Sequence, residues 1–505
     1  MNGPSHVLTL GADLPQMAPY LVLAAGGLVV MLVDAFTGNR RKDHLSLLTL
    51  LTLLGAAAIQ GAAPADPRGA TLLGGMLAAD RFSRFFNLLT VTIAMLTTVY
   101  ATSMFERDGR YRTDFYPLVL FAALGMMLLA AATDLLSLFL AIETMSLAVY
   151  VLVAGNRGSL RSSEAGFKYL ILGAFASAFL LMGLALLYGQ AGATDYASVR
   201  RAVESAPDGG VLLSLACGLV LVALGFKVAM VPFHMWTPDV YDGAPAYVTG
   251  LMAAGVKAAA FAALLRVLWL LPPVAEVWFP LLAVLAVLTM TYGNLVALSQ
   301  SGLKRMLAYS SIAHAGYLLL GVLAVINTGR DSATAVQAAA VRDAAGGAIL
   351  FYLVVYALMN LGAFGVVACL SRSRDQEADA IDGYAGLSRR RPFVAATLAV
   401  FMFSLAGIPP TAGFVGKFYI FDAVVKAGLV PLAIWGVINS LLSAYYYLRV
   451  IVVMYMKPVE GEVHDGHSWE AAFTCGVLAL LVLLLGVVPG SFYALAAHAF
   501  RQMVF

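Results

Sequence analysis

Hydrophobic stretches of about 20 residues, each long enough to cross a bilayer as a helix, follow one another along almost the whole chain. They are continuous runs of Leu, Ala, Val and Gly without period-2 alternation, so the pattern predicts membrane-spanning helices and argues against a β-barrel. We therefore expect an all-α multi-pass membrane protein with about fourteen spans. These lie near residues 18–37, 45–63, 82–101, 115–133, 135–154, 165–189, 211–239, 245–270, 275–298, 304–326, 344–370, 393–427, 430–456 and 471–490.

Two of the spans are interrupted by proline, one at Pro232 and the other at Pro409 and Pro410. A proline inside a span stops the helix, which lipid tolerates only where protein or a wet cavity covers the freed backbone groups. Such kinks also occur in purely structural spans. Two breaks that are five spans apart, however, predict two inverted five-helix repeats, and matching breaks point to a transport path near the midplane. The expected segments are a three-helix start (1–114), the repeats (115–271 and 272–457) and a final helix (458–505).

The amino-acid composition supports a membrane protein and argues against nucleic acid and metal binding. The 505 residues are 61% hydrophobic and only 12% charged, whereas soluble domains carry about 25% charged residues. The net charge of +3, without basic runs among aromatics, argues against nucleic acid as a partner. Three cysteines without CxxC spacing argue against a metal site, and none is expected.

Lysine and arginine in the short loops predict the orientation, because the loops richer in them face the cytoplasm. Alternate crossings place most of these residues on one side, which puts both termini on the outer, periplasmic side. The polar linker 371–391 is then cytoplasmic, and we expect it to be partly helical. The basic set comprises Arg40 to Lys42, Arg107, Arg110, Arg112, Arg157, Arg161, Lys304, Arg305, Arg372, Arg374, Arg389 to Arg391 and Lys457.

Four ionisable residues lie deep within apolar spans: Glu143, Lys227, Lys257 and Lys417. A charge at mid-bilayer costs roughly 2.5–3.5 kcal/mol, so these residues need a use or a compensating partner. Burial lowers the pKa of a lysine, which lets the amine hold and release a proton near neutral pH. Glu143 close to Lys227 would act as a switch on that pKa. The alternative is a structural Glu–Lys pair between helices.

Other polar residues have more ambiguous roles. His234 and His314 are possible relay groups, since a neutral imidazole both donates and accepts, although each also suits a structural hydrogen bond. Lys168 and Arg266 lie near span ends, where long side chains reach the interface. The cluster Tyr445 to Tyr447 is expected to pack or to anchor at an interface.

Five segments together resemble one family, the antiporter-like membrane subunits of respiratory complex I, the proton-pumping NADH–quinone oxidoreductase. They are AIETMSLAVYVL, EAGFKYLILGAFASAFLLMG, GFKVAMVPFHMWTPDVYDGAP, LKRMLAYSSIAHAGY and SLAGIPPTAGFVGKFYIF, and their details are most similar to its subunit N branch. The resemblance implies that Glu143 is the switching carboxylate, Lys227 its partner, Lys257 the connecting lysine and Lys417 the outlet lysine. The family's usual G-P-K reads Gly255-Val256-Lys257 here, without the proline.

The resemblance implies a proton-translocating subunit of the bacterial-type inner membrane, with other membrane subunits, including neighbouring antiporter-like ones, as partners. The chain has no Rossmann glycine pattern, clustered cysteines or paired haem histidines. We therefore expect no cofactor in this chain, and NADH, FMN, iron–sulfur clusters and quinone in partner subunits. The alternatives are a subunit of a multisubunit sodium/proton antiporter or of a membrane-bound hydrogenase, a stand-alone transporter, and a membrane scaffold.

Overall fold

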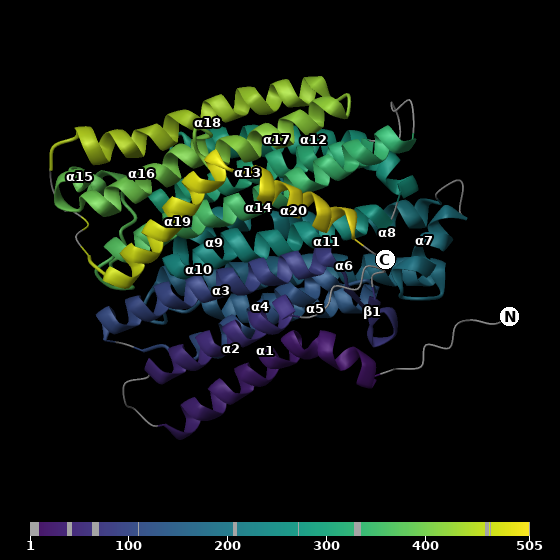
Figure 1. Ribbon diagram of the computed structural model, residues 1–505, viewed down its shortest axis with the longest axis horizontal. Coiled ribbons are helices and arrows are strands. Elements are labelled where there is room, and N and C mark those ends of the chain that lie inside the picture. Colours follow the sequence, from purple (N-terminus) through teal and green to yellow (C-terminus); the bar gives the residue numbers. More distant parts are fainter. Residues whose placement is uncertain are drawn as a thin grey trace.

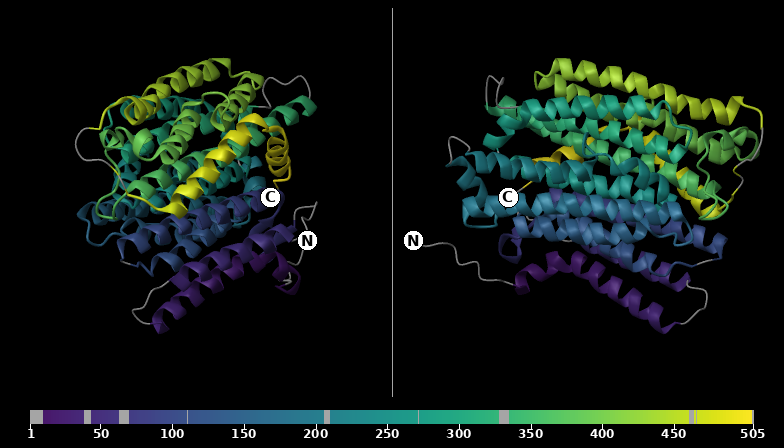
Figure 2. Two further views of the ribbon diagram at one scale, coloured as in Figure 1. Left: turned by 60° about the vertical axis from the view of Figure 1, so that its left-hand side comes forward. Right: turned by 180° about the vertical axis from the view of Figure 1, so that it is seen from behind.

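The computed structural model describes residues 10–37, 43–62, 70–109, 111–205, 210–270, 272–327, 335–459, 464 and 466–503. Within these ranges the molecule is a bundle of helices that run roughly alongside one another (Figure 1). The chain begins with α1 and α2 at one edge and reaches α18 at the opposite edge, as the view from behind also shows (Figure 2). The last helices, α19 and α20, then cross back over one face of the bundle (Figure 1).

The first part of the bundle contains α1 (Leu10–Phe36), α2 (Asp43–Ala62), α3 (Arg81–Asp108), α4 (Phe115–Ala131), α5 (Leu135–Val153), α6 (Leu160–Ala191), α7 (Tyr196–Glu204), α8 (Val211–Val228), α9 (Trp236–Gly243), α10 (Ala246–Leu251) and α11 (Lys257–Leu270). The second part contains α12 (Pro272–Ala297), α13 (Leu303–Asn327), α14 (Ala335–Leu370), α15 (Leu387–Arg390), α16 (Pro392–Ala406), α17 (Ala412–Lys426), α18 (Val430–Met456), α19 (Trp469–Val487) and α20 (Gly490–Arg501). A hairpin of β1 (Ala70–Leu72) and β2 (Leu77–Ala79) precedes α3, with Ala70 opposite Ala79.

The multi-pass helical prediction is confirmed, with fewer full-length spans than expected. Within the described residues, 12 helices are long and apolar enough to cross a bilayer. The expected spans at 115–133 and 393–427 correspond to shorter elements. Helix α4 has 17 residues, and the second region divides into α16 and α17 with 15 residues each.

The break between the expected spans 115–133 and 135–154 separates α4 from α5. Asp134 is the N-cap of α5, and its carboxylate accepts a 2.8 Å hydrogen bond from the Leu136 backbone N–H. An N-cap of this kind satisfies a donor that the helix cannot. The polar linker is partly helical as predicted, with a 3-10 turn at Ile381–Tyr384 followed by α15.

The centre of the bundle holds α11, α13 and α14, whose apolar windows are almost wholly buried. Helices α1, α2 and α6 expose many large apolar side chains on their outer faces, as lipid-facing helices do. Lys257, at the start of α11, is therefore shielded from lipid by the surrounding helices.

The expectation that Arg266 reaches an interface is wrong. Its side chain is 0% exposed, and the guanidinium donates to both carboxylate oxygens of Asp80 at 2.9 Å and to the Ala130 carbonyl at 2.7 Å. A buried arginine is tolerable when a bidentate carboxylate neutralises it. Asp80 precedes α3, far from Arg266 in the chain, so no local pattern pairs them.

Candidate functional site

The first broken helix ends at Val228 in α8 and resumes at Trp236 in α9. Ala229 closes α8 in the left-handed conformation with φ 63°, and Pro232 lies in the connecting segment. The end of α8 has carbonyls that no helical N–H can reach. One of them, on Phe226, accepts a 2.9 Å hydrogen bond from the indole of Trp236.

Lys227 is the penultimate residue of α8 and is 3% exposed. Its ammonium donates a 2.7 Å hydrogen bond to the Ser146 hydroxyl on α5. Aromatic rings surround it, with Tyr150 at 5.6 Å and Tyr169 at 5.8 Å from Nζ to the ring centroid. Such faces stabilise a cation where water is excluded.

Glu143 lies on α5, one turn before Ser146, and is half-buried. Its carboxylate accepts a hydrogen bond from Ser177 on α6. Its charge acts on Lys227, although the ammonium donates its hydrogen bond to Ser146. The acid and the lysine are thus electrostatically coupled without a direct hydrogen bond, an arrangement in which a small movement changes their coupling.

Lys257 begins α11 at the centre of the bundle and is 2% exposed. Its ammonium donates to the Ser311 carbonyl at 2.6 Å and also to the Ser311 hydroxyl. The turn before it, Met252–Val256, is π-helical. An added Cβ on Gly255 would lie 2.9 Å from the sulfur of Met126. A π turn inside a helix is a feature that recurs at functional sites.

The second broken helix ends at Ala406 in α16 and resumes at Ala412 in α17. Gly407 closes α16 with φ 85°, a conformation that glycine adopts without strain, and Pro409 and Pro410 follow it.

Lys417, on α17, is 3% exposed and reaches back to the end of α16. Its ammonium donates to the carbonyls of Leu405 at 2.9 Å and Ala406 at 3.2 Å. A third hydrogen bond, of 2.9 Å, goes to Ser440 on α18. The three donors of the ammonium thus all have partners, and none of these is an acid.

His314 lies between Lys257 and Lys417, and both ammonium groups act on it electrostatically. Its Nδ1 is 2.5 Å from the Tyr352 hydroxyl and its Nε2 is 3.1 Å from the Tyr447 hydroxyl. Tyr447 also shares a hydrogen bond with Ser310, the neighbour of Ser311. A hydroxyl and imidazole chain therefore extends from the Lys257 side of the bundle towards Lys417.

His234 does not join this chain. It follows the first break, is 7% exposed, and packs edge-on against Tyr292 with ring centroids 4.7 Å apart. Its Nδ1 has no hydrogen-bond partner among the described residues. Among the described residues, no hydrogen bond connects His234 to the other site residues, and its relay role stays a prediction.

Sequence reasoning missed the contribution of buried tyrosines to the interior hydrogen-bond network. Tyr445 is 64% exposed, as an interface anchor would be, but Tyr446 and Tyr447 are 0% exposed and belong to the interior network. Tyr352 and Tyr356 both pack on His314. Their spacing of four residues on α14 was the available signal, because it places both on one helix face.

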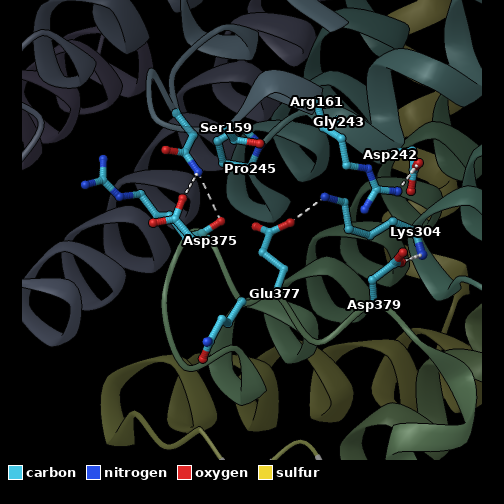
Figure 3. A pocket seen from close by; sticks show the side chains of 12 residues that line it. Ser159, Arg161, Asp242, Gly243, Pro245, Lys304, Asp375, Glu377 and Asp379 are labelled. Atoms are coloured by element: carbon cyan, nitrogen blue, oxygen red, sulfur yellow. Dashed lines mark hydrogen bonds and ion pairs between the residues drawn. The ribbon is translucent and has the colours of Figure 1, made fainter. Parts of the chain in front are cut away.

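A charged pocket of about 160 Å³ lies between the loops at one end of the bundle (Figure 3). In it Lys304 pairs with Glu377 and donates to the Ala244 carbonyl at 2.8 Å. Arg161 pairs with Asp242 at 2.6 Å, in the last turn of α9. Polar groups therefore extend from this end of the bundle to the second half of the first broken helix.

A neighbouring pocket of about 160 Å³ includes Lys168. Its ammonium lies 2.7 Å from Glu164 and 2.9 Å from Asp239 on α9. This lysine is partly exposed and engaged with two acids, and its extension to an interface stays a prediction.

The described residues contain no group of three or more His, Cys, Asp or Glu side chains placed to hold a metal ion. The three cysteines are buried and unbridged.

Comparison with known proteins gives a consistent picture. The family model described as NADH:quinone oxidoreductase/Mrp antiporter, TM matches residues 132–443. NADH-quinone oxidoreductase subunit N of Trichlorobacter lovleyi is 42% identical over 498 residues, which cover 97% of each chain.

Solved structures agree with this match. A chain of respiratory complex I from Thermus thermophilus is 37% identical, with a TM-score of 0.77 over 95% of this chain and 99% of that one. A chain of the Mrp complex from Dietzia sp. has a TM-score of 0.83 over 96% and 97% of the two chains, at 21% identity. The second likeness shows a shared fold.

Proposed function

The chain belongs to the family of membrane subunits shared by NADH:quinone oxidoreductases and Mrp antiporters, and from that premise we propose that it carries protons across the bilayer through a buried relay, as a subunit of an NADH–quinone oxidoreductase. The proposed carriers are Glu143, Lys227, Lys257 and Lys417, with His314 between the last two. Identity of 42% with subunit N over nearly the full chain favours this over the sodium/proton antiporter and hydrogenase alternatives.

One observation carries the proposal: each of the three proposed carrier lysines is held by neutral oxygens. Lys227, Lys257 and Lys417 donate to serine hydroxyls and backbone carbonyls. A permanently charged buried group needs a carboxylate, as Arg266 has in Asp80. Hydroxyl and carbonyl partners accept from an ammonium, and a hydroxyl can also donate to a neutral amine. Such sites suit a lysine that gains and loses a proton.

The relay would work by changing which charge is close to which lysine. A proton on Lys227 is favoured while ionised Glu143 is near, and movement of the carboxylate away from Lys227 weakens that hold. The released proton would pass to Lys257 and Ser311, and from there through the neighbouring Ser310, Tyr447 and His314 towards Lys417. Gaps longer than hydrogen-bond distance require water.

We also propose the two inverted repeats, 115–271 and 272–457. The two broken helices support them, and so does close packing at the start of each half. A Cβ on Gly125 of α4 would lie 2.4 Å from the Met145 backbone nitrogen of α5. A Cβ on Gly293 of α12 would lie 2.6 Å from the Ala313 nitrogen of α13. Counting α4 and the α16–α17 pair as crossings gives the fourteen spans of the proposal.

For orientation, we propose that the end of the bundle with α15 faces the cytoplasm and that both termini are periplasmic. Helix α1 begins and α20 ends at the opposite end of the bundle from α15 (Figure 1). Redox chemistry with NADH, FMN, iron–sulfur clusters and quinone would take place in partner subunits, and neighbouring antiporter-like subunits would adjoin this chain.

The test is NADH-driven proton uptake by sealed vesicles that contain the purified complex. Lys417→Met should abolish uptake while the complex still assembles. Lys426→Met is the matched control, because Lys426 is on the same helix but exposed and paired with Asp422. Normal uptake with Lys417→Met, Lys257→Met and Lys227→Met would refute the relay.

A further inference from the structure

An apolar groove lies on the face of the bundle that α20 crosses, between α3, α14 and α20 (Figure 1). Its volume is about 520 Å³, within the range of about 300–1,000 Å³ for small-molecule sites. The groove contains none of the relay residues. Its apolar walls are formed by Phe85, Leu88, Leu89, Val354, Leu358 and Phe492.

Along α3, the residues that line the groove change from basic to apolar. The residues that face it follow helical spacing, beginning with Arg81 and Arg84 and continuing through Phe85 to Leu88, Leu89 and Thr92. On α20 the order is reversed, from Phe492 to His498 in the last turn. Both helices therefore place their basic residues at the same end of the groove and their apolar residues along its length.

The basic rim of the groove is Arg81, Arg84 and His498. Nη1 of Arg81 donates to Nδ1 of His498 at 2.8 Å, and the two arginines act on each other as like charges. Asp80, the residue before Arg81, has both oxygens engaged by Arg266, and Nε of Arg84 donates to the Gln60 carbonyl at 2.8 Å. The Nε of Arg81 is buried without a hydrogen-bond partner among the described residues.

The position of Arg81 is also unfavourable for the helix itself. It is the first residue of α3, where the helix dipole disfavours a cation. An arginine next to another arginine at a positive helix end, with one buried donor unused, is stabilised by an anion in front of it. The groove leads away from that position into the apolar part of the bundle.

We propose that this groove binds one acyl chain of an anionic phospholipid, with its phosphate at Arg81, Arg84 and His498. The rim lies where α3 begins, at an end of the bundle, which is the depth of headgroups, and the groove runs along the helix as an acyl chain does. The phosphodiester supplies oxygens for the guanidinium donors. The site is separate from proton transfer, so its test is independent of the relay variants.

The experiment uses the intact complex, stripped of lipid in neutral detergent and incorporated into vesicles that contain phosphatidylglycerol with a photoreactive acyl chain. Light should attach the probe to peptides of α3, α14 or α20. Arg81→Gln should reduce labelling about fivefold, since each basic residue near an anionic headgroup contributes about that factor. Leu89→Trp keeps the charges but fills the groove, and it should abolish labelling.

Arg342→Gln is the control, because Arg342 lies near the start of α14 and stacks on Trp269 at 4.5 Å, away from the groove. It should label as the unmodified complex does. A second measurement needs no variant: added phosphatidylglycerol should raise the unfolding temperature of the stripped complex more than phosphatidylcholine does.

Three results would overturn the proposal. One is equal labelling by a phosphatidylcholine probe together with equal stabilisation by both lipids. Another is unchanged labelling in Leu89→Trp. The third is attachment of the groove residues to a neighbouring subunit in place of lipid, which would identify the groove as a protein interface.

Discussion

Each of the two broken helices has a buried lysine near its break, but the two lysines are held in different ways. Lys227 belongs to the helix before its break, whereas Lys417 belongs to the helix after its break. In the first break the neutral indole of Trp236 satisfies the Phe226 carbonyl. In the second, the Lys417 ammonium satisfies the carbonyls of Leu405 and Ala406.

In the first break, one residue caps the helix and another is the buried lysine. In the second break, the buried lysine is itself the cap. Because Trp236 caps α8, Lys227 is available to Ser146 and to the charge of Glu143. Lys417 itself caps α16, and its hydrogen-bond partners are backbone carbonyls and one hydroxyl. In the proposed relay, the first site is switched by an acid, whereas the second is set by backbone groups. The two proposed repeats therefore each contain a broken helix but hold their lysines differently.

The largest expected effect is that of Lys417→Met. It should reduce proton uptake by about 100-fold, as loss of a positioned proton carrier does. It should also destabilise the second half, because each unsatisfied buried carbonyl costs roughly 1–3 kcal/mol. Uptake and urea unfolding of the complex measure the two effects. Lys227→Met should match the first effect and lack the second, and equal destabilisation by both variants would break the comparison.

Lys257→Arg should impair uptake nearly as much as Lys257→Met. Arginine keeps the positive charge but does not deprotonate in a protein, so it cannot pass a proton on. The measurement is the initial rate of proton uptake in sealed vesicles, with NADH oxidation recorded in parallel. If the arginine variant pumps normally, a fixed charge is sufficient at this position.

Glu143→Gln should lower uptake about tenfold or more and leave the stability of the second half unchanged, because the amide still accepts from Ser177 but no longer carries charge. The same measurement on Glu164→Gln, on exposed α6 surface, is the matched control. An equal loss in the control variant would show that any nearby acid matters and that Glu143 is not a specific switch.

The smallest expected effect is that of Trp236→Phe. The ring still stacks on Tyr169, 4.5 Å away, but the Phe226 carbonyl keeps only its 3.2 Å hydrogen bond from the Ala229 N–H, and loss of the indole bond costs about 0.5–1.5 kcal/mol. Unfolding of the complex should detect the loss, and proton uptake should fall only slightly. Loss of uptake as complete as in Lys227→Met would mean that Trp236 does more than cap α8.

Much of the fold could be predicted from residue patterns alone. Long apolar runs require helices in lipid, and prolines at 232 and at 409 and 410 mark where two helices stop. Asp134 was identifiable as a turn because a run of nearly forty apolar residues cannot be one crossing. The cost of burying charge singled out Glu143 and the three lysines.

Partners could not be predicted, because they come from helices far away in the chain. Ser311 meets Lys257 across 54 positions, and Ser146 meets Lys227 across 81. The same reason explains Arg266, whose acid lies 186 positions away, and Tyr447, whose burial depends on α13 and α14 packing around it. A sequence pattern reports depth in the membrane and helix face, but not which neighbour covers that face.

The sequence by itself thus determined that this chain spans a membrane many times, where its helices break, and that Lys227, Lys257 and Lys417 are buried. These follow from local rules: the thickness of the bilayer, the missing N–H of proline and the cost of a buried charge. Only the tertiary structure decided which oxygens hold each lysine, that Lys417 reaches back to cap α16, and that His314 but not His234 joins the tyrosine network. Those outcomes depend on packing between helices, where a rotation of one helix exchanges every neighbour of a side chain.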